Sequence, residues 1–121
     1  MVRNFFIIRE VKRMKITFSD GVMTAYVEGE IDHHTAPSIR EQIDERIEKD
    51  KPSVLKLDYN GVTFMDSSGI GLIMGRYKLV SSYSGKIEVV NVPINMAKVV
   101  KLSGIEKLGT VKIKGGQYES N

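Results

Sequence analysis

The fold of this chain is decided at residues 66–77, which read Asp66-Ser67-Ser68-Gly69-Ile70-Gly71-Leu72-Ile73-Met74-Gly75-Arg76-Tyr77. An apolar run at residues 54–58, Val-Leu-Lys-Leu-Asp, precedes this stretch and has the character of a buried strand. The residues after Gly69 have the character of a helix, so residues 66–68 lie between a strand and a helix. Aspartate and serine are favoured there because their side-chain oxygens accept hydrogen bonds from the free amides of the first helical turn. The residue types predict a helix cap, and an exposed serine on that turn is also a candidate for phosphorylation.

The composition indicates one globular domain. The chain has 121 residues, of which 41% are hydrophobic, and no apolar run approaches the roughly 20 residues that a membrane span needs. It has no cysteine, which excludes disulfides, thiolate metal sites and cysteine nucleophiles. The absence of cysteine also fits a reducing compartment, so we expect a cytoplasmic protein. The lack of a long apolar run leads us to expect no membrane partner.

The net charge of +3 comes from the N-terminus. Residues 1–13 hold four basic side chains and one acidic side chain, whereas residues 14–121 hold 14 of each. The body of the protein is balanced, so we expect no nucleic-acid partner. We predict an N-terminal extension at residues 1–13, with Met14 as an alternative start, and a domain at residues 14–121 that ends in a short polar tail.

Strands and helices alternate along the rest of the chain. Asp20-Gly21 predicts a hairpin between strands at residues 15–18 and 23–27. A helix with Thr35 as N-cap and Pro37 in its first turn follows, and Lys51-Pro52 ends it. We expect residues 59–65 to form a loop, residues 86–90 a strand, Asn95 to cap a short helix, and residues 110–113 the last strand. Helices between successive strands require crossovers, so the pattern predicts a single α/β domain with a mixed, largely parallel β-sheet and helices packed against it.

Two glycines lie inside the helix that follows Ser68. Gly71 and Gly75 each cost up to about 1 kcal/mol relative to alanine, which indicates a close approach to the sheet or to a partner backbone. Exposed apolar surface near Leu72 would mark a protein-binding patch, and the alternative is simple packing in the core.

The residues that carry chemistry do not form a known catalytic set. The G-x-S-x-G elbow is absent around Ser67 and Ser68, so we expect no catalytic residues and no enzyme. His33 and His34 lack the spacing of zinc ligands, so we expect no metal. Asp32 and Asp66 both follow strands and are expected to approach each other. Residues 69–75 resemble a glycine-rich phosphate loop without its Gly-Lys-Ser/Thr ending, which leaves weak GTP or ATP binding as an alternative to having no cofactor.

Two stretches carry a resemblance to a known family. The first is Gly29-Glu30-Ile31-Asp32-His33-His34-Thr35-Ala36, and the second is Phe64-Met65-Asp66-Ser67-Ser68-Gly69-Ile70-Gly71, continuing to Gly75-Arg76-Tyr77-Lys78. Together they resemble the bacterial anti-sigma-factor antagonists of the STAS-domain family, and most closely those that act in sporulation. The likeness extends in outline over residues 14–113.

The resemblance implies a regulatory switch. In that family the unphosphorylated antagonist binds an anti-sigma factor that is also a serine kinase, and this releases the sigma factor. The kinase then phosphorylates the second serine of Asp-Ser-Ser-Gly, which is Ser68 here, and a serine phosphatase reverses the step. The resemblance implies that Asp32 and Asp66 shape recognition by the kinase. We also expect Ser67, Gly69 and Leu72 to take part in recognition of the partner or the kinase. A related phospho-switch in a stress-type relay is the alternative.

Overall fold

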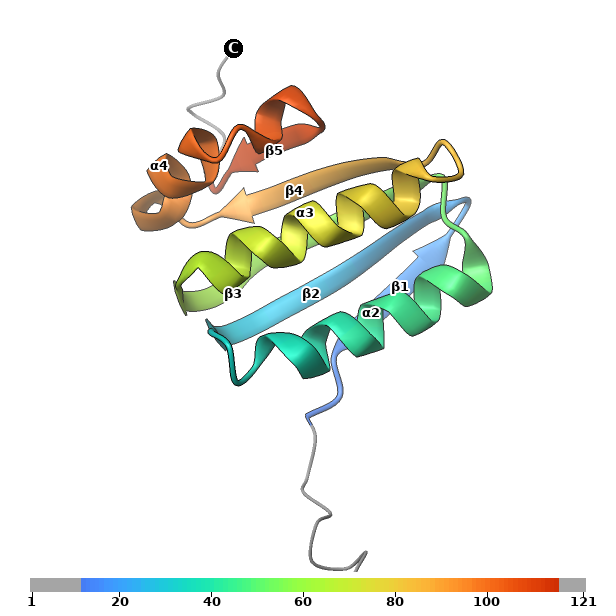
Figure 1. Cartoon of the computed structure of the whole chain (residues 1–121), viewed down its shortest axis with the longest axis horizontal. Coiled ribbons are helices and arrows are strands. Elements are labelled where there is room, and N and C mark those ends of the chain that lie inside the picture. The colour runs from blue at the N-terminus through green and yellow to red at the C-terminus, as the bar shows by residue number, and fades with distance from the viewer. Residues whose placement is uncertain (1–11, 116–121) are drawn as a thin grey trace, which may run out of the picture.

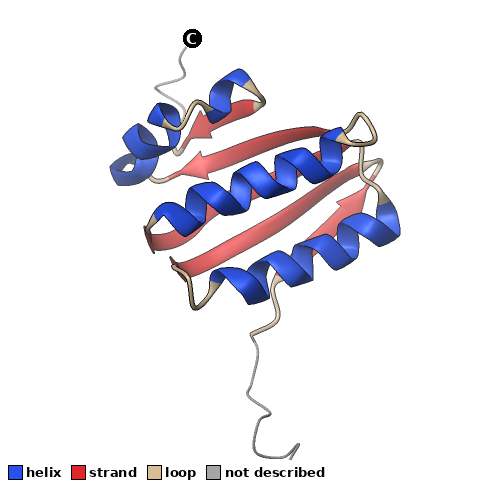
Figure 2. Cartoon of the chain, in the orientation of Figure 1, coloured by secondary structure: helices blue, strands red, loops and turns tan. Residues whose placement is uncertain are grey.

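The computed structural model describes residues 12–115 and places five strands in one sheet, in the order β1-β2-β3-β4-β5 (Figure 1, Figure 2). The strands are β1 (Lys15–Ser19), β2 (Val22–Ile31), β3 (Val54–Met65), β4 (Lys86–Val92) and β5 (Thr110–Ile113). Strand β1 is antiparallel to β2, and the remaining neighbours are parallel. The helices are α2 (Ala36–Asp50), α3 (Ser67–Ser81), α4 (Ile94–Leu102) and a short 3-10 helix, η1 (Ile105–Lys107). The predicted α/β domain with a mixed, largely parallel sheet is confirmed.

Most of the core lies between one face of the sheet and two helices, and α4 and η1 add buried residues to it. Helices α2 and α3 run side by side across that face (Figure 1). Alternate residues of the two central strands point into this layer and are fully buried: Met23, Ala25, Val27, Leu55, Leu57 and Tyr59. The residues between them, on the opposite face, are partly exposed. This alternation is typical of a sheet that is covered on one face.

The predicted hairpin and the limits of α2 are confirmed. Asp20 and Gly21 have φ values of 51° and 81°, which suit the two central positions of a hairpin turn. Helix α2 carries Pro37 in its first turn and ends at Lys51, which has a φ of 43° and donates its backbone N–H to the carbonyl of Ile47 at 2.7 Å. Such a left-handed residue satisfies a carbonyl at the helix end.

The loop expected at residues 59–65 is wrong, because β3 continues through this segment to Met65. The pairing between β2 and β3 shifts register twice. Strand β3 has one extra residue opposite the interval from Tyr26 to Glu28 of β2, and a second opposite the step from Gly29 to Glu30. Asn60 and Gly61 therefore lie at an irregularity within the strand. Tyr59 and Val62 remain buried on either side. Residues typical of turns also occur at bulges, which is why the pattern was misleading.

The start of α4 also differs from the prediction. The helix begins at Ile94 with Pro93 at the N-cap, so Asn95 lies inside the helix and does not cap it. Proline fixes its own φ and keeps the preceding residue extended, and β4 accordingly runs to Val92. The 3-10 helix η1 was not predicted. The extension predicted at residues 1–13 lies mostly outside the described residues.

Candidate phosphorylation surface

The loops that carry Asp32 and Asp66 leave the sheet at the same edge. Ile31 and Met65 are paired in the last register position of β2 and β3, and the backbone N–H of Asp66 donates to the carbonyl of Ile31 at 3.1 Å. The two aspartates therefore follow directly from neighbouring strand ends. This agrees with the expectation that they approach each other, because the carboxyl ends of parallel strands share one edge.

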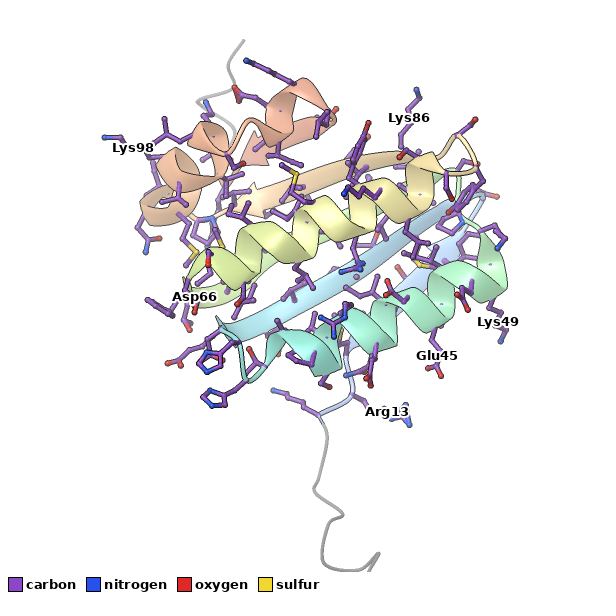
Figure 3. All side chains as sticks on the ribbon, viewed as in Figure 1. Arg13, Glu45, Lys49, Asp66, Lys86 and Lys98 are labelled. Atoms are coloured by element: carbon purple, nitrogen blue, oxygen red, sulfur yellow. The ribbon has the colours of Figure 1, made fainter. Side chains whose placement is uncertain are left out.

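Asp66 caps helix α3. Its backbone is extended, and its Oδ1 accepts a hydrogen bond from the N–H of Ser68 at 2.7 Å. The carbonyl of Asp66 accepts the N–H of Gly69 at 2.9 Å. Ser67 is exposed and Ser68 is half-buried, so both serines lie on the first turn at the rim of the sheet. Figure 3 shows Asp66 at the N-terminal end of α3, where the side chain reaches the surface. The predicted cap is confirmed.

Asp32 organises the neighbouring loop. Its Oδ1 accepts hydrogen bonds from the N–H groups of His34 at 2.8 Å and Thr35 at 3.1 Å. These bonds, that to His34 first, lower the pKa of Asp32 because they favour its ionised form. Thr35 occupies the N-cap position of α2, but its hydroxyl does not cap the helix. The hydroxyl instead accepts the N–H of Asp32 at 3.0 Å and donates to the carbonyl of Glu30 at 2.8 Å.

The rings of the adjacent histidines lie close together. Neighbouring side chains often point apart, yet the rings of His33 and His34 lie 4.0 Å apart between centroids. His34 Nδ1 is 3.9 Å from Asp32 Oδ1. Among residues 12–115, no group of three or more histidine, cysteine or acidic side chains could hold a metal ion.

The close approach expected of the helical glycines occurs at Gly69. A Cβ added there would lie 2.5 Å from Met65 Sδ and 2.8 Å from Met65 Cβ, whereas one added at Gly71 or Gly75 would meet nothing within 4 Å. The carbonyl of Gly69 also accepts a hydrogen bond from the hydroxyl of buried Tyr59 at 3.1 Å. The first alternative, that Gly71 and Gly75 closely approach the sheet, is therefore wrong. The second, that a partner backbone approaches these glycines, stays a prediction.

Leu72 lies in the core. Its side chain is only 4% exposed, so of the two alternatives for this position, exposed apolar surface and core packing, the structure shows core packing. The exposed apolar side chain near Asp66 is instead Phe64, at 52% exposure. Phe64 belongs to one of the two stretches that carry the family resemblance. Its exposure was not predicted, because it depends on β3 continuing through residue 64, where the sequence predicted a loop.

An ion pair that the sequence analysis missed joins α3 to α2. Arg76 is 6% exposed, and its Nε lies 2.8 Å from Asp44 Oδ1. Its Nη1 donates to the carbonyl of Leu72 at 3.2 Å. Burial lowers the pKa of Arg76, and the carboxylate of Asp44 opposes this effect. Arg76 is four residues after Leu72 and three after Ile73, so it lies near them on the helix surface, but only the structure shows that this side of the helix is buried.

Comparison with known proteins identifies the family. The model of the STAS domain family matches residues 13–114, and the chain therefore belongs to this family. A relative named anti-sigma F factor antagonist from Paenibacillus polymyxa is 38% identical over 88 residues, which are 73% of this chain and 75% of the relative. An anti-sigma-B factor antagonist from Listeria monocytogenes is 26% identical over 79% of this chain and 83% of its own. The structure of the Bacillus cell fate determinant SpoIIAA in its phosphorylated form has a TM-score of 0.65 and 25% identity, and covers 84% of this chain and 92% of SpoIIAA.

Proposed function

We propose that this protein is an anti-sigma-factor antagonist that is switched by phosphorylation of Ser68. The unphosphorylated form binds an anti-sigma factor with serine kinase activity, and this binding releases the sigma factor. One observation carries the proposal: Asp66 caps α3 so that Ser67 and Ser68 lie on its first turn, in a chain similar to proteins named anti-sigma F factor antagonist.

The proposed step is a phosphoryl transfer from ATP. The Ser68 hydroxyl oxygen attacks the γ-phosphorus, the bond from that phosphorus to the β,γ-bridging oxygen breaks, and ADP leaves. The hydroxyl proton passes to a base of the kinase. A serine phosphatase hydrolyses the phosphoserine and returns Ser68 with inorganic phosphate. The antagonist supplies the acceptor hydroxyl and performs no catalysis.

The helix N-terminus explains why the fold tolerates the phosphate. The group adds roughly 1.5 to 2 negative charges beside free backbone amides, where the helix dipole favours an anion. At an interface the same charge must be desolvated, and the carboxylate of Asp66, which binds the Ser68 N–H, repels it. Phosphorylation should therefore weaken partner binding and leave the fold intact.

The surrounding residues would have separate roles in recognition. We propose that Asp66 positions Ser68, that Asp32 holds the adjoining loop, and that Ser67 lies within the partner contact. Gly69 lets the first turn approach Met65. Buried Leu72 would act only indirectly, by anchoring α3, and exposed Phe64 would supply an apolar contact.

Two alternatives remain. The anti-sigma-B relatives support a stress-type relay that uses the same switch with a different sigma factor. The second alternative is weak binding of a nucleotide at the glycines of α3. Calorimetric titration with GTP and ATP separates this second alternative, since a nucleotide-binding module would show saturable heat without a partner protein.

Phosphorylation by a candidate anti-sigma kinase tests the proposal. The native chain and the variants Ser68→Ala and Ser67→Ala are incubated with kinase and ATP, and intact masses are measured. We expect one phosphate on the native chain and on Ser67→Ala, and none on Ser68→Ala. A phosphate on Ser68→Ala but not on Ser67→Ala would move the switch to Ser67. No phosphate on any form, with an active cognate kinase, would contradict the switch.

A further inference from the structure

Charge is unevenly distributed along this domain. Residues 14–93 hold nine basic and twelve acidic side chains, whereas residues 94–114 hold five basic and one acidic. The balanced total for residues 14–121 therefore conceals a C-terminal unit with a net charge of +4. This unit comprises α4, η1 and β5, which pack together at one edge of the molecule (Figure 1).

The outer face of α4 is apolar as well as basic. Ile94, Val99 and Leu102 are 63%, 52% and 75% exposed, while the inner face of the helix is buried. Lys98 is exposed on the same outer face, four residues from both Ile94 and Leu102, and Figure 3 shows it extending away from the sheet. Lys101 is half-buried at the side of this face. We call these five residues the α4 patch: Ile94, Lys98, Val99, Lys101 and Leu102.

The C-terminal unit carries three more cations outside the α4 patch. Lys107 of η1 and Lys112 and Lys114 at β5 are all exposed, and Leu108, at 42% exposure, follows η1. All five cations of this unit are lysines, and residues 94–114 contain no arginine, phenylalanine, tyrosine or tryptophan.

We propose that the α4 patch docks onto an anionic phospholipid bilayer. Lysine stems lie along apolar surface while their ammonium groups reach outward to lipid phosphates, and aliphatic side chains enter the boundary with the acyl chains. Each lysine near an anionic surface strengthens binding by roughly a factor of five. Protein interfaces are instead enriched in aromatic residues and arginine and depleted of lysine. A second copy of this chain would bring the same net positive charge to the contact.

This proposal revises the expectation of no membrane partner, which depended on the lack of an apolar run long enough to span a membrane. It concerns attachment to a surface. Within residues 12–115 no helix is long and apolar enough to cross a bilayer.

Vesicle co-sedimentation of the full chain tests the proposal. Vesicles of phosphatidylcholine mixed with phosphatidylglycerol are compared with vesicles of phosphatidylcholine alone, at low and high ionic strength. We expect binding to the mixed vesicles only, and weaker binding at high salt. The variant Lys98→Gln/Lys101→Gln should bind about thirty-fold more weakly, and Leu102→Ser roughly tenfold more weakly.

A matched variant controls for general charge attraction. Lys15→Gln/Lys49→Gln removes the same charge from β1, the sheet edge opposite β5, and from α2, and residues 1–13 are unchanged in every variant. Figure 3 shows Lys49 far from Lys98. The control should bind as the native chain does. Circular dichroism verifies that each variant is folded.

Three outcomes would overturn the proposal. The first is no sedimentation with anionic vesicles at low salt, and the second is an equal loss in the α4 and control variants. The third is that the α4 variants bind vesicles normally but lose affinity for the anti-sigma factor or lose self-association in sedimentation equilibrium. That result would assign the α4 patch to a protein contact.

Discussion

Arg76 Nε lies 2.8 Å from Asp44 Oδ1, and this ion pair joins the helix that carries Ser68 to helix α2. The arginine is almost fully buried, whereas the aspartate side chain is 31% exposed. The two partners are therefore unequal. Removing the carboxylate leaves a cation in the core, but removing the cation leaves a carboxylate that water can reach.

Stability should follow this asymmetry. Asp44→Asn should lower the free energy of unfolding by about 2 to 3 kcal/mol, below the usual loss for a fully buried pair because Asp44 is partly solvated. Arg76→Met should cost less, since it removes the buried charge and keeps an apolar stem. Urea unfolding measures both. The control Asp50→Asn breaks the contact of 3.6 Å with Arg46 on α2 and should cost no more than about 0.5 kcal/mol. Equal losses for Asp44→Asn and Asp50→Asn would contradict the structural role of the buried pair.

Alanine at the three glycines of α3 should give opposite effects. Gly69→Ala should destabilise the protein by about 1 to 3 kcal/mol, because the new methyl meets Met65 at less than 3 Å. Gly71→Ala and Gly75→Ala should each stabilise it by roughly 0.5 to 1 kcal/mol, since their Cβ positions are open. The midpoint of urea unfolding decides the sign. If a partner backbone approaches the open glycines, the same two variants will bind the anti-sigma factor more weakly although they are more stable.

The cap at Asp66 should be separable from the negative charge of its side chain. Asp66→Ala should cost about 1 kcal/mol of stability, while Asp66→Ser should restore most of it through its hydroxyl oxygen. Thermal unfolding provides the comparison. If recognition by the kinase needs the carboxylate, the serine variant will be stable but a poor substrate. A serine variant that is as unstable as the alanine variant would argue against the observed bond to Ser68.

The carboxyl of Asp32 should titrate below its ordinary value of 3.8. A pKa lowered in the folded state means that Asp32 contributes stability above the unfolded value, and that this contribution is lost as the pH falls through the folded value. Because the pKa of an aspartate in the unfolded chain is roughly 3.9, the stability contribution of Asp32 is lost at about pH 4 and below. Carbon-13 shifts of the carboxyl against pH report this titration directly. A midpoint at or above 3.8 would mean that the bonds from His34 and Thr35 are absent in solution.

Local patterns predicted most of the fold because each is dictated by chemistry near it in the chain. Asp20-Gly21 suits a tight hairpin, Pro37 suits the first turn of a helix, and Asp66 suits an N-cap. What the sequence could not show depends on contacts between distant residues. Asn60-Gly61 has the composition of a turn, yet pairing with β2 holds it within a strand.

The candidate site was also predictable in its local features and not in its long-range contacts. The position of Ser67 and Ser68 at the start of α3 follows from local residue types. The burial of Leu72 and Arg76 does not, because it depends on how α3 packs against the sheet and α2. The open choice between surface and core at Leu72 and the missed exposure of Phe64 have this common cause.

The most direct test of the switch compares the affinity of the two forms of this protein for the anti-sigma factor. The native chain and the chain phosphorylated at Ser68 are titrated into the purified anti-sigma factor by calorimetry, and matched urea unfolding curves verify that both are equally folded. We expect the unphosphorylated form to bind, and the phosphorylated form to bind at least about tenfold more weakly, a loss of roughly 1.4 kcal/mol or more. Equal affinity of the two forms would contradict the proposed switch.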